Sequence, residues 1–365
     1  MDGKIERSFN VGILGENQDL NTLIGQVFGA PGMRSDLQFF NRLDTPLKQV
    51  FCAVTPIDYP DKIKPLLQTL MLTDIYVLVL DMNTGLNPTV GELLIGIDLF
   101  NQMFNKKTII TINNIEGNQW KLSNEINKLK KIIKTTSLDG CDILELKNKT
   151  DFEDLKKKAG NLGISLLDRE KEPEVPTYTK LLIDHVFPVK GIGPVALAII
   201  KKGILKRGEM LELVGNNTTP KKIIVKNIQK QDRNLDVAYK NDRVGIALKG
   251  VKPNEVNRDF ILTSPNILKK ESEIEAKVYI NKFFNPKEGK ITPGKEKQYY
   301  GLVDLRLSPL KFMDGDEILA GNSGNLKMKF DKPLFHDGTG LKGIVTELNK
   351  FENKNRIVGY FEQKI

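Results

Sequence analysis

The pattern of apolar residues changes abruptly near residue 171, and this change limits the folds open to the chain. Before it, short apolar runs typical of buried strands alternate with stretches in which apolar residues recur at helical spacing. After it, the helical spacing disappears, and short alternating strands follow between Gly, Pro, Asn and Asp residues. The sequence therefore predicts an α/β domain with a mostly parallel sheet, followed by two antiparallel β-barrels.

The first 170 residues contain the strand-and-helix alternation. Five apolar runs are expected to form strands: Asn10–Leu14, Val50–Val54, Ile75–Asp81, Thr108–Ile112 and Asp142–Leu146. Apolar residues at helical spacing predict three helices between them: around Leu20–Val27, around Leu93–Phe100 and over Asn124–Thr135. This order is that of a doubly wound α/β domain.

The remainder of the chain is expected to be all β. The charged, proline-containing stretch Glu170–Thr179 is interpreted as a linker, and Thr263–Lys270 as a second break. The predicted strands are Lys180–Val189, Val195–Lys201, Glu209–Val214, Lys222–Ile228, Val244–Leu248, Ile274–Ile280, Gln298–Leu307, Asn325–Phe330, Leu341–Leu348 and Arg356–Phe361. The expected domains are residues 1–172, 178–266 and 271–365.

Composition indicates a protein of the cytoplasm. The 365 residues can bury two or three cores, and no apolar run reaches the roughly 18 residues of a membrane span. The N-terminus lacks the apolar segment of a secretory signal. Cys52 and Cys141 lie in no metal-binding spacing and are expected to be thiols in a reducing compartment.

Positive charge is concentrated in the predicted barrels. Residues 1–170 carry 20 Lys and Arg against 22 Asp and Glu, whereas residues 171–365 carry 35 against 24, a net charge of +11. A basic surface of this size suits a polyanion such as RNA. A solvated, lysine-rich surface is the alternative explanation.

The second predicted domain contains a recognisable motif. Phe187–Gly215 is similar to the barrel that follows the GTPase domain in elongation factor Tu and its relatives, and Asp242–Pro265 matches a later part of that barrel. Asp259 stands where the family usually has glycine. The matching residues are Phe187, Gly191, Gly193, Val195, Gly203, Leu205, Gly208, Glu209, Gly245, Leu248, Gly250 and Val251.

The end of the chain resembles the third barrel of the same superfamily. The run Arg356–Tyr360 is most similar to archaeal selenocysteine-specific elongation factor and initiation factor 2 gamma. The resemblance implies a GTPase-like domain and two barrels. It also implies binding of tRNA between the domains, and we expect the fourth domain of the selenocysteine factors to be missing.

Measured against this family, the first domain lacks most phosphate-binding residues. If Gly15 is the first glycine of the P-loop, Leu20 replaces the second glycine and Asn21 the lysine, while Thr22 keeps the hydroxyl that holds Mg²⁺. Glu16 and Asp19 bring negative charge to the place of the phosphates. Neutral Asn cannot replace an ammonium group, so phosphate binding is expected to be weak.

The other family motifs are altered as well. Thr55–Tyr59 occupies the place of Asp-x-Pro-Gly-His, and the domain contains no histidine that could orient an attacking water. The guanine-reading Asn-Lys-x-Asp becomes Asn113–Glu116, and Glu145–Lys147 replaces the last motif. Scaffold residues that match are Gly85, Pro88 and Glu92, and Ser35–Asp36 is interpreted as the remnant of a switch loop.

The resemblance therefore implies a vestigial GTP site at Gly15, Thr22, Asn113 and Glu116, with Thr22 as the Mg²⁺ ligand if a nucleotide binds. Each residue also has a structural explanation, as an exposed helix residue, a strand-end cap or a solvated acid. We expect no catalytic residue and no cofactor, although GTP or GDP with Mg²⁺ stays an alternative.

Three functions remain open at this point. The first is a translation elongation factor-like protein that binds tRNA or another RNA and has impaired GTP hydrolysis. The second is an active GTPase with unusual motifs, and the third is a regulatory or protein-interaction paralogue. The ribosome and translation factors are further expected partners, whereas membranes and DNA are not. The sequence does not indicate the oligomeric state or a link to selenocysteine.

Overall fold

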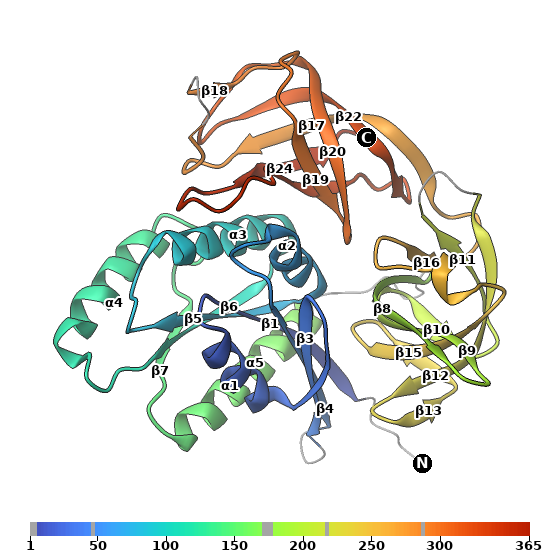
Figure 1. Ribbon diagram of the computed structural model, residues 1–365, viewed down its shortest axis with the longest axis horizontal. Coiled ribbons are helices and arrows are strands. Elements are labelled where there is room, and N and C mark those ends of the chain that lie inside the picture. The colour runs from blue at the N-terminus through green and yellow to red at the C-terminus, as the bar shows by residue number, and fades with distance from the viewer. Residues whose placement is uncertain (1–5, 45–47, 170–177, 216–218, 286–288) are drawn as a thin grey trace. The chain divides into compact units, whose positions relative to one another are not determined.

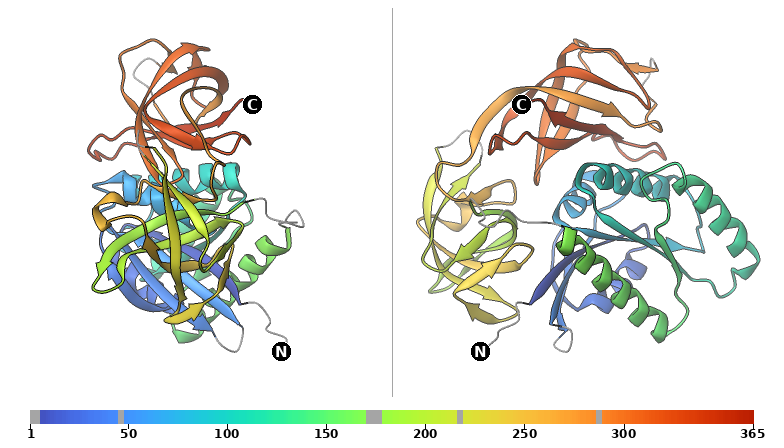
Figure 2. Two further views of the ribbon diagram at one scale, coloured as in Figure 1. Left: turned by 90° about the vertical axis from the view of Figure 1, so that its right-hand side faces the viewer. Right: turned by 180° about the vertical axis from the view of Figure 1, so that it is seen from behind.

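A computed structural model describes residues 6–44, 48–169, 178–215, 219–285 and 289–365 (Figures 1 and 2). The chain forms two compact units. The first comprises Met1–Lys171 together with Leu348–Ile357, and the second comprises Glu172–Glu347 together with Val358–Ile365. Most of the predicted linker, residues 170–177, lies outside the described residues.

The first unit is built on one twisted sheet in the order β2-β3-β4-β1-β5-β6-β7. The strands from β4 to β7 run parallel, and β3 and β2 add an antiparallel hairpin at one edge. The strands are β1 (Arg7–Gly15), β2 (Ala30–Arg34), β3 (Leu37–Asp44), β4 (Gln49–Pro56), β5 (Ile75–Asp81), β6 (Lys107–Asn113) and β7 (Asp142–Glu145).

Helices cover both faces of this sheet. The odd-numbered residues of β1 pack with α1 and α5 into one core, while Gly12 on the opposite face lies against α2. Figure 1 shows α1 and α5 on one side and α2 and α3 on the other. The helices of the described part of this unit are α1 (Gln18–Phe28), α2 (Ile63–Leu72), α3 (Pro88–Phe104), α4 (Gln119–Ile133) and α5 (Lys149–Arg169).

The five predicted strands and three predicted helices of this unit are confirmed, but four elements were missed. Helices α2 and α5 and strands β2 and β3 were not expected. The segment after α1, in which Ser35–Asp36 was interpreted as the remnant of a switch loop, forms the β2–β3 hairpin, with Ser35 and Asp36 between its strands. Phe39 and Phe40 of β3 are buried, which explains why the segment forms a strand.

The second unit begins with a barrel of six strands in the order β11-β16-β8-β9-β15-β12, closed by pairing of β11 with β12. The short strand β13 extends β12, and β10 pairs with β14. The elements are β8 (Lys180–Val189), β9 (Gly193–Lys202), β10 (Ile204–Lys206), β11 (Met210–Val214), β12 (Lys221–Lys230), β13 (Arg233–Leu235), β14 (Val237–Tyr239), β15 (Arg243–Lys249), β16 (Ile261–Thr263) and the 3₁₀ turn Pro253–Glu255.

A second barrel follows, closed in the order β17-β22-β20-β19-β23-β24, with the small pair β18–β21 beside it. The predicted strand Gln298–Leu307 is wrong: β19 and β20 are separate strands, because Asp304 adopts a left-handed conformation (φ 52°) and turns the chain back. The strands are β17 (Lys269–Ile280), β18 (Lys290–Ile291), β19 (Tyr299–Val303), β20 (Arg306–Gly315), β21 (Ile318–Leu319), β22 (Ser323–His336), β23 (Lys342–Thr346) and β24 (Ile357–Gln363).

Polar contacts join the two barrels within the second unit. The Lys180 ammonium lies 2.9 Å from the Asp304 carboxylate. Asp337 accepts a hydrogen bond from the Tyr178 hydroxyl and pairs with Lys202 at 3.1 Å. Burial acts to raise the pKa of Asp337, but hydrogen bonds from Thr339, Tyr178 and Lys202 outweigh it and hold this pKa well below its usual range.

This depressed pKa makes the second unit sensitive to acid. A carboxyl whose pKa is lower in the folded state contributes stability above its unfolded pKa of about 3.9 and loses it as the pH falls further. We therefore expect Asp337→Asn to lower the urea midpoint of the second unit at pH 7 and to lower it by a smaller amount at pH 2, where part of the ionic contribution has already been lost. Urea titrations at the two pH values, followed by circular dichroism, measure the difference. An equal loss at both would contradict an ionic role for Asp337.

Candidate functional site

The carboxyl edge of the parallel sheet is where ligands bind in α/β proteins, and here the chain passes directly from strand to helix. Strand β1 ends at Gly15 and α1 begins at Gln18, so Glu16 and Asn17 alone connect them. The Asn17 side chain caps α1 and accepts hydrogen bonds from the amides of Asp19 (3.0 Å) and Leu20 (3.2 Å). These amides belong to the group that binds anions at a helix N-terminus.

Gly15 is required because other groups approach its backbone closely. A Cβ at this position would lie 2.5 Å from Oδ1 of Asn21 and 2.9 Å from the Val79 side chain. Asn21 itself is buried, and its Nδ2 donates to the Gly15 carbonyl at 2.9 Å. The side chain of Asn21, predicted to stand at the lysine position of a P-loop, is therefore directed back to Gly15.

The other predicted site residues lie near the same edge, but the side chains of two of them are bonded to backbone or side-chain groups of the helix and strands that carry the site. The Thr22 hydroxyl donates to the Gln18 carbonyl at 2.9 Å within α1. Buried Asn113, at the end of β6, donates to Thr111 Oγ1 (3.1 Å) and the Leu80 carbonyl (3.4 Å). Glu116 is exposed in the turn before α4.

Asp81, which the sequence analysis did not single out, connects three segments at this edge. It follows the apolar run of β5 directly and is 3% exposed. Its carboxylate accepts from Nδ2 of Asn17 (2.8 Å), from Nδ2 of Asn114 (2.8 Å) and from the Asn83 amide (2.9 Å). Asp81 could have been predicted as a site residue, because it is an acidic residue at the carboxyl end of a buried strand.

Glu16 extends this polar network to the loop before α3. Its carboxylate accepts a hydrogen bond from Nδ2 of Asn87 at 2.8 Å and another from the Thr84 hydroxyl. Asn87 also caps α3 through the Val90 amide. Two carboxylates and four amide or hydroxyl side chains thus satisfy one another where a nucleotide phosphate would approach.

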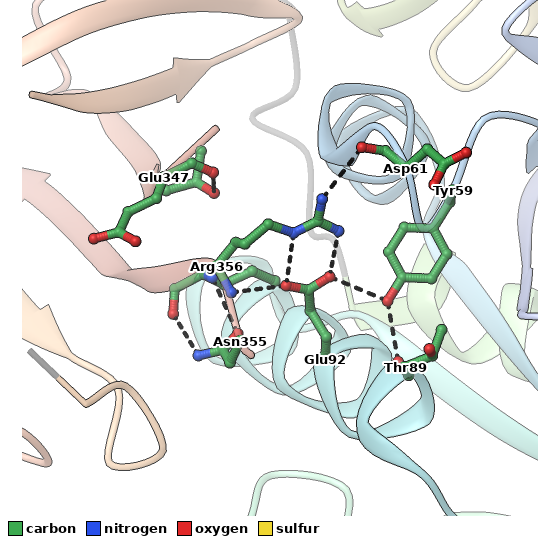
Figure 3. A network of polar contacts seen from close by, with 9 residues as sticks. Tyr59, Asp61, Thr89, Glu92, Glu347, Asn355 and Arg356 are labelled. Carbon is green, nitrogen blue, oxygen red and sulfur yellow. Dashed lines mark hydrogen bonds and ion pairs between the residues drawn. The ribbon is translucent and has the colours of Figure 1, made fainter. Parts of the chain in front are cut away.

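Tyr59, predicted from the sequence motif to align with the family's histidine, is part of a separate buried network (Figure 3). Its hydroxyl lies 3.0 Å from the Thr89 carbonyl and 3.2 Å from Oε2 of Glu92. Burial raises the pKa of this hydroxyl well above its ordinary value, and the Glu92 carboxylate raises it further. Tyr59 is therefore a fixed hydrogen-bond donor and cannot serve as a base at neutral pH.

Glu92 is held on its other side by Arg356. Nη2 of Arg356 lies 2.7 Å from Oε2 of Glu92, and the Arg356 amide and Nε bond Oε1 at 2.7 and 3.2 Å (Figure 3). Both side chains are at most 3% exposed, and the guanidinium lies 5.0 Å from the Phe351 ring. Glu92 and Arg356 were each noted in the sequence, but no sequence pattern predicted that they form an ion pair.

Neither a metal-binding cluster nor a membrane-spanning helix is found among the described residues. No cluster of three or more His, Cys, Asp or Glu side chains there could hold a metal ion. None of the helices within the same ranges is long and apolar enough to cross a membrane.

A GTPase-like α/β unit followed by two barrels defines a class of protein, and comparisons agree with it. Residues 193–263 match the family model of elongation factor Tu domain 2. Translation elongation factor SelB from Methanococcus maripaludis, solved with a GTP analogue, superimposes with a TM-score of 0.81 at 23% identity, covering 99% of this chain and 79% of that one. A bacterial selenocysteine-specific elongation factor gives 0.78 at 18%, covering 98% and 58%.

Proteins related in sequence also point to this family. The uncharacterized protein MJ0325 of Methanocaldococcus jannaschii is 30% identical over 268 residues, which cover 73% of this chain and 77% of the relative. The selenocysteine-specific elongation factor of the same organism is 34% identical over 218 residues, 58% of this chain and 44% of that protein. The chain belongs to the elongation factor Tu-like family of translational GTPases.

Proposed function

We propose that this protein is a translation-associated RNA-binding protein in which the α/β unit acts as a scaffold and no longer as a GTP-driven switch. The connection between β1 and α1 carries this proposal. A P-loop wraps a phosphate with several backbone amides and a lysine. Here two residues join strand and helix, and Asn17 already occupies two amides of the first turn of α1.

Charge at the edge of the sheet supports the loss of nucleotide binding. Glu16 and Asp81 bring carboxylates into the polar network, and Asp19 lies in the first turn of α1. Asn21, at the lysine position, supplies no positive charge. A triphosphate would meet like charges there and would have to displace satisfied hydrogen bonds, each worth about 1 kcal/mol or more.

RNA is the proposed ligand because of the charge of the barrels and the family relationship. Residues 171–365 carry a net charge of +11. The chain is similar to a selenocysteine-specific elongation factor, and tRNA and the ribosome follow as proposed partners in the cytoplasm. In this proposal the barrels bind the RNA backbone, and nucleotide state has no influence on affinity.

Filter binding of labelled tRNA at several KCl concentrations tests this function. A protein that contacts six or more phosphates loses about 10³-fold in affinity between 50 and 200 mM salt. We expect a loss of this order, unchanged by GTP, GDP or Mg²⁺. Salt-insensitive binding, or none, would exclude RNA as the ligand.

Calorimetric titration with GTP and GDP tests the proposed loss of the switch. We expect no binding heat at about millimolar nucleotide with Mg²⁺ present, because Glu16, Asp81 and Asn17 fill the phosphate position. Micromolar binding accompanied by hydrolysis would instead identify an active GTPase with unusual motifs.

A further inference from the structure

The first barrel of the second unit carries exposed apolar side chains on its outer face. Met210 of β11 stands opposite Ile224 of β12, and Ile224 stands opposite Lys249 of β15. Met210 is 49% exposed and Ile224 41% exposed. These residues therefore form a continuous row across three adjacent strands.

The turn between β8 and β9 adds a third apolar side chain beside this row. Ile192 in this turn is 47% exposed, and its carbonyl lies 3.5 Å from Nζ of Lys226 on β12. We call this surface the β12 face. It consists of the apolar residues Met210, Ile224 and Ile192 and the lysines Lys190, Lys222, Lys226 and Lys249.

Positive charge on the β12 face is not neutralised. All four lysines are exposed, and none forms an ion pair with a carboxylate in the part of the chain that the structure describes. Lys221, which precedes Lys222 on β12, differs because it pairs with Glu255 at 2.7 Å. The β12 face thus has an apolar centre surrounded by lysine ammonium groups that can pair with the carboxylates of a partner.

The carboxylates of Glu212 on β11 and of Glu209, just before this strand, are bonded to backbone amides. Glu212 stands opposite Lys222 in the strand register but is 8% exposed, and its Oε2 accepts from the Asn266 amide at 3.0 Å. Glu209 accepts from the Lys206 amide at 3.0 Å. These carboxylates stabilise loops of the barrel and leave the charge of the lysines uncompensated.

We propose that the β12 face binds an acidic protein segment whose aliphatic side chains pack on Met210, Ile224 and Ile192. Protein interfaces combine an apolar centre with a charged rim, and flexible methionine suits such a surface. The four lysines select an acidic partner by charge complementarity. This partner lies beyond the RNA-binding function proposed above.

The composition of the face favours a protein over RNA. Sequence-tolerant RNA surfaces present aromatic side chains or arginines on which bases stack. The β12 face consists of aliphatic side chains and lysines only. Exposed aliphatic groups gain nothing from a phosphate backbone, whereas an acidic segment with Leu, Ile or Val covers them.

Selection from a phage-displayed library of random 16-residue peptides tests the proposal on the full chain. We expect enriched sequences that combine Asp and Glu with Leu, Ile, Val or Met. In fluorescence anisotropy with an enriched peptide, Ile224→Ser should weaken binding by about tenfold or more, because truncating a central apolar contact has effects of this size. Lys222→Glu combined with Lys226→Glu should weaken binding at least as much and abolish the preference for acidic peptides.

Matched controls lie on the other barrel. Leu319 is 54% exposed, and Lys277 and Lys311 are exposed, so Leu319→Ser and the double variant Lys277→Glu, Lys311→Glu repeat the aliphatic-to-serine change and the double charge reversal outside the β12 face. We expect peptide affinity to change less than about twofold in both, since surface changes away from a site have small effects. Circular dichroism verifies that each variant is folded.

Three results would overturn the proposal: no enrichment of acidic aliphatic peptides, equal peptide affinity in the face and control variants, or loss of tRNA binding alone in the Lys222→Glu, Lys226→Glu variant. The last would assign the face to RNA. Failure of the proposed RNA binding can be distinguished from failure of this proposal. In the first case the unaltered protein does not bind tRNA, and the peptide selection still tests the β12 face.

Discussion

Replacing Arg356 with Met is expected to destabilise the α/β unit by about 3–5 kcal/mol, the usual effect of removing one partner from a buried ion pair. The substitution leaves the Glu92 carboxylate, which is 1% exposed, without its guanidinium. It also removes the donors at 2.7 and 3.2 Å from the Arg356 side chain. Urea unfolding followed by circular dichroism measures the loss as a lower midpoint for the first unit.

Two companion variants separate charge from packing in this network. Tyr59→Phe removes one hydroxyl from Glu92 and should cost about 1 kcal/mol. The double variant Glu92→Met, Arg356→Met removes both charges and should recover most of the lost stability, because paired apolar replacements of buried ions are often neutral. If Arg356→Met alone were nearly neutral, the network would not be a stabilising element.

Replacing Gly359 with Ala is expected to destabilise the second unit by about 3 kcal/mol, at the upper end of the range for overpacking. A Cβ at Gly359 would lie 1.8 Å from the carbonyl oxygen of Tyr279 on the paired strand β17. The obstacle is backbone, so no rotamer change relieves it, and β24 must move away from β17. Hydrogen exchange of amides in these two strands reports the expected loosening.

Gly91 provides the control for this substitution. It lies inside helix α3, and a Cβ there meets no atom within 4 Å. Alanine is a better helix former than glycine, so Gly91→Ala should stabilise the protein by up to about 1 kcal/mol. Similar destabilisation by both changes would indicate that the close approach at Gly359 has no special effect.

The run Arg356–Tyr360, whose sequence resembles archaeal selenocysteine-specific elongation factor and initiation factor 2 gamma, shows what a sequence can and cannot reveal. Its pattern predicted a strand, and Ile357–Gln363 is β24. The structure adds separate reasons for its residues: Arg356 pairs with Glu92, Gly359 admits a neighbouring strand, and Tyr360 packs on Tyr279 with ring centroids 5.3 Å apart. These contacts join residues far apart in the chain, so local pattern could not show them.

Helices and strands in which apolar residues recur at a regular spacing could be predicted from the sequence. Elements without such a spacing could not. Strand β5 (Ile75–Asp81) was predicted with its observed bounds, because its apolar run is fully buried. Helix α2 was missed because nearly all of its residues are buried, so no polar face marks the helical period. Strands β19 and β20 merged in the prediction, since a two-residue turn at Asp304 leaves little trace in composition.

The strand ends at which the candidate site residues lie could be predicted, but the hydrogen bonds of these residues could not. Gly15 ends β1 and Asn113 ends β6, two parallel strands with β5 between them in the sheet. The partners of Asn17 and Glu16 lie 64 and 71 positions further along the chain, in Asp81 and Asn87. Such partners follow from the parallel order of β1, β5 and β6, which only the folded chain brings together.

The membership of Leu348–Ile357 in the first unit has a consequence for how this protein can be divided. A fragment of residues 1–171 would contain Glu92 and Tyr59 in its interior without Arg356, and would bury an anion that has no counter-ion. The α/β unit is therefore not a transferable module. Gene fusion or domain shuffling near residue 171, where the sequence changes from α/β to all β, would separate the core of the α/β unit from Arg356.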